Sequence, residues 1–138
     1  MRVEPEERVD TLAREVVDSV MEVHRTLGPG FSESVYEEAL ATELALRCIP
    51  FERQVQVAIS YKGEEVGRGQ LDLLVADELI VELKAVDSLC AFHTAQVISY
   101  LKATRRRVAL LVNFNNRLMK DGIRRIIHAP GAVSAGGS

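Results

Sequence analysis

Two acidic residues and a lysine lie within a hydrophobic stretch of this chain. Asp72 is followed by a nine-residue gap and then by Glu82-Leu83-Lys84. The run Leu79–Val86 is otherwise almost entirely apolar, as in a strand that is covered on both faces. Side chains alternate along a strand, so Glu82 and Lys84 share one face. Charges in such a strand are costly unless they are paired or bind a ligand.

The three charged side chains could support phosphodiester chemistry. Asp72 and Glu82, on neighbouring strands, could share a hard cation such as Mg²⁺, and the carbonyl of Leu83 could supply a third oxygen. Such an ion polarises a phosphodiester and lowers the pKa of a bound water. Lys84 could then orient or deprotonate that water, or stabilise charge on the phosphate. A salt-bridge cluster between Lys84 and the two carboxylates is the alternative interpretation.

A third acidic residue, Glu33, stands at the start of a predicted helix. Tyr36, Leu40 and Leu44 follow it at +3, +7 and +11, which is the spacing of one helix face. This register predicts that Glu33 points inward, towards the sheet, where it could join the site. The alternative is a first-turn glutamate that interacts favourably with the helix dipole.

A later predicted helix carries a polar stripe. His93, Gln96 and Tyr100 are spaced at i, i+3 and i+7. Because this helix follows the Glu82–Lys84 strand, Gln96 and Tyr100 could lie near the end of that strand and hold a phosphate or a nucleophilic water. A solvated helix face is the alternative. His24, on the apolar stripe of the first helix, is interpreted as a hydrogen-bonded core histidine.

The hydrophobic pattern predicts a mixed α/β domain. Helices are expected over 5–27, 32–47 and 87–104, and strands over 51–61, 66–75, 79–86 and 107–114. Residues 122–128 fit either a short strand or a helical turn. This order predicts a mixed central sheet flanked by helices.

Length and composition indicate one domain. Among the 138 residues, 1–128 are expected to form it and 129–138 a disordered tail. No apolar run approaches the length of a membrane span, and the acidic N-terminus does not resemble a signal peptide, so we expect a cytoplasmic protein. Cys48 and Cys90 lack metal-ligand spacing and are expected to be buried, reduced thiols.

Charge is distributed unevenly along the chain. Residues 1–83 hold 8 Lys/Arg and 18 Asp/Glu, whereas residues 84–138 hold 9 and 2. The basic half could be the footprint of a polyanion ligand. Equally, the two halves could neutralise each other across the fold. The basic residues in question are Lys102, Arg105, Arg106, Arg107, Arg117, Lys120, Arg124 and Arg125.

Together these motifs resemble the PD-(D/E)XK nuclease superfamily, and within it the small bacterial GxxExxY family. Gly30-Phe31-Ser32-Glu33-Ser34-Val35-Tyr36 matches the motif that gives the family its name. Asp72 matches the metal-binding aspartate, and Glu82-Leu83-Lys84 the (D/E)-x-K element. Gln96–Tyr100 matches the QxxxY motif of the RecB-like and lambda-exonuclease-like branch. Leu71 stands where the superfamily often has proline.

The resemblance implies a restriction-endonuclease-like αβββαβ core with an added N-terminal helix. It also implies a Mg²⁺- or Mn²⁺-dependent nuclease, with DNA expected before RNA as its substrate and a homo-oligomer or a partner protein for target recognition. The implied metal ligands are Asp72, Glu82, Leu83 and Glu33, with Lys84, Gln96 and Tyr100 as further catalytic residues. A non-catalytic nucleic-acid-binding or regulatory module on the same fold is the alternative.

Overall fold

The computed structural model describes residues 5–129. It contains helices α1 (Pro5–Leu27), α2 (Glu33–Leu46) and α3 (Ala91–Thr104), a short 3₁₀ helix η1 (Met119–Gly122), and strands β1 (Phe51–Tyr61), β2 (Glu64–Val75), β3 (Leu79–Lys84), β4 (Val108–Asn113) and β5 (Ile123–Ile127). The predicted tail, apart from Ala129, lies outside the described residues.

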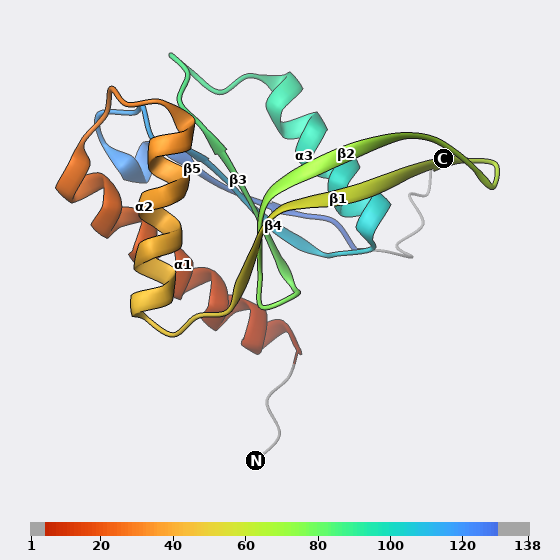
Figure 1. Cartoon of the computed structure of the whole chain (residues 1–138), viewed down its shortest axis with the longest axis horizontal. Helices are drawn as coiled ribbons and strands as arrows, with labels where there is room; N and C mark the ends of the chain where they lie inside the picture. Colours follow the sequence, from red (N-terminus) through yellow and green to blue (C-terminus); the bar gives the residue numbers. More distant parts are fainter. Residues whose placement is uncertain (1–4, 130–138) are drawn as a thin grey trace.

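The five strands form one sheet in the order β1-β2-β3-β4-β5. Neighbouring strands run antiparallel except β3 and β4, which are parallel and are joined through α3. Helices α1 and α2 lie on one side of the sheet and α3 on the other, and the far end of the β1–β2 hairpin projects beyond the helices (Figure 1). The predicted mixed sheet flanked by helices is therefore confirmed, as is the added N-terminal helix.

Each face of the sheet has its own apolar core. Leu73, Val81 and Leu110 face α1 and α2, whereas Leu74, Ile80 and Leu111 face α3. Strands β3 and β4 are consequently apolar on both faces, which explains their nearly uninterrupted hydrophobic sequence. Because the central strands are buried on both sides, polar side chains within them need a specific partner or function.

The predicted limits of α1, residues 5–27, are confirmed. Gly28, at φ 70°, ends the helix in a left-handed conformation that glycine adopts at low cost. Within this helix Met21 is 41% exposed and Val23 is buried. Val35 of α2 is likewise exposed. No helix within residues 5–129 is both long and apolar enough to cross a membrane.

Several strand boundaries also differ from expectation. Lys62 and Gly63 both have positive φ, so a two-residue turn lets β2 begin at Glu64 rather than 66. Strand β3 ends at Lys84 rather than 86 because the side chain of Asn113 bonds both the N–H and the carbonyl of Val86. Helix α3 accordingly starts later, at Ala91. Residues 119–127 form both a helical turn and a strand.

The prediction that Cys48 and Cys90 are buried is wrong. Both are free and exposed. Cys48 lies in a left-handed turn just after α2, and Cys90 occupies the N-cap position of α3. The apolar helix residues next to them are exposed as well, with Leu46 at 75% and Phe92 at 70%, so both cysteines lie at helix ends that reach the surface.

Candidate functional site

Strands β2 and β3 separate at Asp72 and Glu82. Their ladder pairs Leu73–Val75 with Leu79–Val81 and is not continued beyond Leu73. The backbone N–H of Asp72 instead donates to Glu82 Oε1 at 2.9 Å, and the N–H of Leu83 donates to Asp72 Oδ2 at 2.8 Å. These reciprocal bonds bring the two carboxylates together at the point where the strands diverge.

Each carboxylate retains one oxygen that the protein does not use. Asp72 Oδ1 and Glu82 Oε2 accept no hydrogen bond from an N–H or hydroxyl group of residues 5–129, although the two carboxyls can share a hydrogen bond when Glu82 is protonated. Every fully buried side-chain oxygen or nitrogen in that range has a partner, so these two oxygens reach solvent. Mg²⁺ is commonly held by one or two carboxylates together with waters and substrate phosphates. The donor set therefore fits a hard divalent cation.

The carboxylates are in an environment that disfavours two negative charges. Burial, followed by the charge of Asp72, raises the pKa of Glu82 to about 8. Burial also raises the pKa of Asp72, and the charges of Glu37 and Glu33 raise it further. Glu82 is 3% exposed. A positive charge between these groups would offset the cost of ionising both.

Lys84 lies next to this pair without forming an ion pair. Its Nζ is 3.4 Å from Gln96 Oε1, a polar contact between β3 and α3. Lys84 forms no salt bridge with any acidic residue that the structure describes. The interpretation of Asp72, Glu82 and Lys84 as a salt-bridge cluster is therefore wrong, and the ammonium group is available for another partner.

The three polar residues of the α3 stripe make different contacts. Gln96 reaches Lys84, as the sequence predicts. Tyr100 is half-buried and packs over Gly69 of β2, where its ring occupies the space that a Cβ would need. His93 accepts a hydrogen bond from the N–H of Cys90 and so caps the helix instead of facing the site.

The close approach of Tyr100 to Gly69 provides a local test of the α3–β2 contact. A Cβ on Gly69 would lie 2.5 Å from Tyr100 Cε1, so Gly69→Ala must displace the ring. We expect a loss of about 1–2 kcal/mol in the free energy of unfolding, measured by urea denaturation. Gly67→Ala is the matched control, because no atom lies within 4 Å of its Cβ position. Equal stability of the two variants would contradict this packing.

Glu33 is exposed, so the expectation that it points into the protein is wrong. Ser32 is the N-cap and Glu33 is the first residue of α2, one turn before the first buried side chain, Tyr36. The apolar register is correct from Tyr36 onwards. The charge of Glu33 nevertheless contributes to the raised pKa of Asp72, so the two carboxylates are close enough to repel each other.

The spacing of Gly30 and Tyr36 has a structural explanation. Tyr36 is fully buried and stacks on Phe114 with ring centroids 4.4 Å apart. Its hydroxyl donates to the carbonyl of Gly28 and accepts from the N–H of Phe31, which closes the loop before α2. Gly30 has a φ of 113°, a conformation that side chains rarely adopt. This loop fixes where α2 begins.

Two residues near the site were not identified from the sequence. Glu37, one helical turn after Glu33, contributes the largest charge effect among those that raise the pKa of Asp72. The i, i+4 spacing from Glu33 could have indicated it. Asn113 is fully buried beside Lys84 in the β3–β4 ladder, and it orders the segment that leads from Lys84 to α3. In the sequence, Asn113 stands out solely as a polar residue at the end of an apolar strand.

Part of the basic half is neutralised within the fold. Arg106 pairs with Asp77 at 2.7 Å, Arg125 pairs with Asp10, and Arg107 lies 4.0 Å from Glu6. These arginines support the interpretation that the two halves of the chain compensate each other. Within residues 84–129, the exposed basic residues that form no ion pair with the described part of the chain are Lys102, Arg105, Arg117, Lys120 and Arg124.

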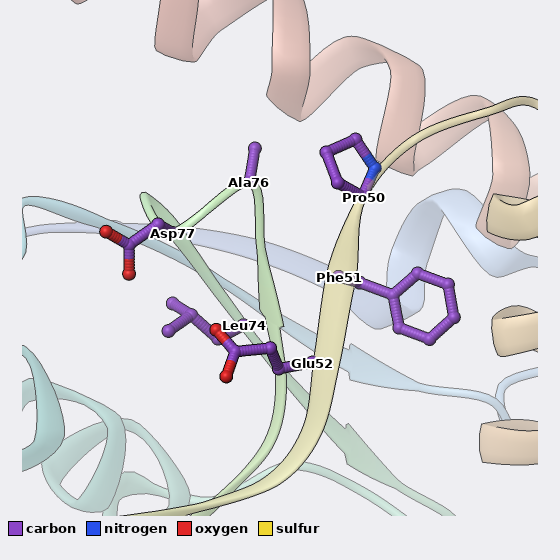
Figure 2. A pocket seen from close by; sticks show the side chains of 6 residues that line it. All are labelled: Pro50, Phe51, Glu52, Leu74, Ala76 and Asp77. Atoms are coloured by element: carbon purple, nitrogen blue, oxygen red, sulfur yellow. The ribbon is translucent and has the colours of Figure 1, made fainter.

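A pocket of about 340 Å³ lies at the base of the β1–β2 pair and contains none of the site residues. Figure 2 shows its lining side chains, which are those of Pro50, Phe51, Glu52, Leu74, Ala76 and Asp77. It is open and mainly apolar, with the carboxylates of Glu52 and Asp77 at its margin. The candidate chemistry therefore belongs to the separation between β2 and β3, not to this pocket.

Comparison with known proteins agrees with this fold. The fold is similar to that of the crystal structure of SSO0001, with a TM-score of 0.50 and 20% sequence identity over 70% of this chain. The chain spans about half (50%) of the length of that protein. No curated protein matches the sequence. A sequence model described as the PD-(D/E)XK nuclease superfamily matches residues 10–126. The chain therefore belongs to the PD-(D/E)XK nuclease superfamily.

Proposed function

We propose that this protein is a Mg²⁺- or Mn²⁺-dependent nuclease that hydrolyses phosphodiester bonds of DNA at Asp72, Glu82 and Lys84. The observation that carries the proposal is the pair of reciprocal hydrogen bonds between β2 and β3. They fix one oxygen of each carboxylate and leave the other open. Two such oxygens beside an unpaired lysine, in a member of a nuclease superfamily, are suited to metal-assisted hydrolysis.

Each site residue has a distinct role in this proposal. A divalent cation bound by Asp72 and Glu82 would polarise the phosphodiester and acidify a bound water. The carbonyl of Leu83 would be a third oxygen ligand, and Glu33 would contribute directly or through water. Lys84 would orient the attacking water and either take up its proton, as a neutral amine, or stabilise charge on the phosphate, as an ammonium group.

Helix α3 completes the arrangement. The amide oxygen of Gln96 holds the ammonium group of Lys84 in place. Tyr100, packed over β2, presents its hydroxyl for contact with the scissile phosphate or the attacking water. These contacts position reacting groups, which is the main contribution a protein makes to phosphoryl chemistry besides charge stabilisation.

Two motifs support a narrower family assignment. Gly30–Tyr36 supports membership of the GxxExxY family, because the loop that Gly30 and Tyr36 build sets the position of Glu33. Gln96–Tyr100 supports the RecB-like and lambda-exonuclease-like branch, since both residues lie on the α3 face that contacts β2 and β3.

The basic residues without ion pairs are candidates for contacts with nucleic acid, and the free cysteines favour a reducing compartment. Lys102 and Arg105, at the end of α3, are candidates for phosphate-backbone contacts, which position nucleic acid without reading its sequence. The exposed thiols of Cys48 and Cys90 suit a reducing cytoplasm. Self-association or a partner protein would supply target recognition.

The test is metal-dependent cleavage. Purified protein is incubated with single- and double-stranded DNA and RNA in Mg²⁺ or Mn²⁺. We expect DNA cleavage that EDTA and Asp72→Ala both abolish. Salt-sensitive DNA binding without any cleavage would instead identify a non-catalytic binding module. Intact substrates under all metal conditions, or an active Asp72→Ala variant, would refute the nuclease proposal.

A further inference from the structure

Glu37 connects α2 to the strand that flanks Asp72. Its side chain is 12% exposed, although a glutamate in a surface helix is usually solvated. Glu37 Oε2 accepts from Arg53 Nε at 2.9 Å, and Oε1 accepts from Gln54 Nε2 at 2.6 Å. Both carboxylate oxygens are therefore used to hold two consecutive residues of β1.

Strand β1 is irregular at the position that Glu37 holds. Arg53 pairs with Leu73 and Val55 pairs with Leu71, so Gln54 stands opposite Asp72 without a regular pairing. Gln54 has a φ of 53°, in the left-handed region. That conformation costs a residue other than glycine about 1–3 kcal/mol unless its surroundings enforce it. The hydrogen bond to Glu37 is a contact that can enforce it.

Asp72 is thus located between two departures from regular sheet structure. On the β1 side it faces the strained Gln54, and on the β3 side its N–H and carboxylate bond to Glu82 and Leu83. The negative charge of Glu37 also acts on Asp72 more strongly than that of Glu33. A change at Glu37 would therefore be transmitted to Asp72 through β1.

We propose that Glu37 is a positioning residue of the site, which holds Gln54 in its left-handed conformation and thereby sets the placement of Asp72. The inference rests on the proposed function for its effect on catalysis, but its effect on the backbone of Asp72 is independent of any activity. Glu37 does not contact the reacting atoms.

The chain offers a matched control. Glu38, the next residue in α2, also binds Arg53, at 2.8 Å, but it makes no contact with Gln54 and its side chain is 69% exposed. Glu37→Ala and Glu38→Ala therefore remove one carboxylate each from the same arginine. Only Glu37→Ala releases Gln54.

Three measurements apply to these variants. For Glu37→Ala we expect Mn²⁺ affinity, measured by calorimetry, to fall about 10–100-fold, as on loss of an outer-shell partner. We expect kcat for DNA cleavage to fall by a similar factor with KM nearly unchanged. Hydrogen exchange of the Asp72 amide, followed by NMR without metal, should become faster. Glu38→Ala should match the wild type in all three.

A second substitution tests the mechanism directly. Glycine adopts positive φ without an anchor, so Gln54→Gly should make Glu37 dispensable. We expect Glu37→Ala in the Gln54→Gly background to recover slow amide exchange at Asp72 and most of the lost Mn²⁺ affinity. If Glu37→Ala alone is too unstable to study, the comparison of Gln54→Gly with this double variant replaces it, and the two should behave alike.

The proposal is overturned if Glu37→Ala leaves the exchange of the Asp72 amide unchanged. It is also overturned if Glu38→Ala has the same effects, or if Gln54→Gly fails to rescue. These results differ from failure of the proposed function. An inactive wild-type protein would remove the kcat comparison but leave the Asp72 exchange measurement decisive.

Discussion

Lys84→Met is expected to reduce kcat for DNA cleavage by roughly 10²–10⁴-fold, the range found when a positioned general acid or base is lost. Methionine retains much of the length of lysine but can neither carry the charge nor accept a proton. Lys84 forms no salt bridge with the described residues, so its removal breaks no ion pair. We therefore expect the free energy of unfolding to change by less than about 1 kcal/mol.

Lys84→Arg separates two roles of the side chain. Arginine keeps the positive charge but is not deprotonated in proteins. If Lys84 takes up a proton from the attacking water, Lys84→Arg should be as inactive as Lys84→Met in a steady-state cleavage assay. Lys62→Met, in the exposed turn between β1 and β2, is the control and should be fully active. Activity of Lys84→Met within about threefold of wild type would exclude the lysine from the chemistry.

Glu82→Gln is expected to inactivate the enzyme and also to stabilise the metal-free protein at alkaline pH. Glutamine preserves the acceptor for the Asp72 N–H and can donate to the Asp72 carboxylate. It removes the cost of burying two adjacent negative charges. At pH 8.5 we expect an increase of roughly 1–3 kcal/mol in the free energy of unfolding, measured by urea denaturation in EDTA.

The sign of the pH dependence follows from the pKa of Glu82. That pKa is ordinarily 4.5 for a glutamate and is about 8 in the folded protein. Between these values the folded state holds a proton that the unfolded state has released, so the stability of the metal-free protein falls as pH rises. The contribution is complete below pH 4.5 and lost through pH 8. The raised pKa of Asp72 acts in the same direction.

Glu82→Gln should flatten this decline, and Mg²⁺ should stabilise the wild type at pH 8.5 but not the variant, because the cation binds the ionised carboxylates. Glu64→Gln, in the exposed β1–β2 hairpin, is the control and should keep the wild-type pH profile. Identical profiles for the wild type and Glu82→Gln would show that Glu82 ionises normally.

Much of the fold could be predicted because hydrophobic periodicity reports burial directly. The end of α1 at Gly28 and the two-sided burial of β3 follow from local sequence. The premature end of β3 could not be predicted, since it depends on Asn113, 27 residues from Val86. The exposure of Cys48 and Cys90 was missed because apolar neighbours in sequence do not show which way a turn faces.

The site could be predicted where the spacing of its residues matches the side-chain repeat of a strand or a helix. The adjacency of Asp72 and Glu82, and the approach of Gln96 to Lys84, follow from the order of the elements and the motif spacing. The orientation of Glu33 was predicted wrongly because α2 begins one turn before its first buried side chain, Tyr36. The role of Gln54 and Glu37 could not be inferred, because a left-handed residue within a strand leaves no mark in hydrophobic alternation.

The most direct test of a metal-assisted site is a crystal structure of the protein soaked in Mn²⁺, with anomalous diffraction data collected to locate the ion. We expect one strong anomalous peak between Asp72 and Glu82, bound by the carboxylate oxygens that the protein leaves open. We also expect Lys84 to face a water on that ion. An ion bound elsewhere, or none at concentrations that support cleavage, would contradict the assignment of this carboxylate pair as the catalytic centre.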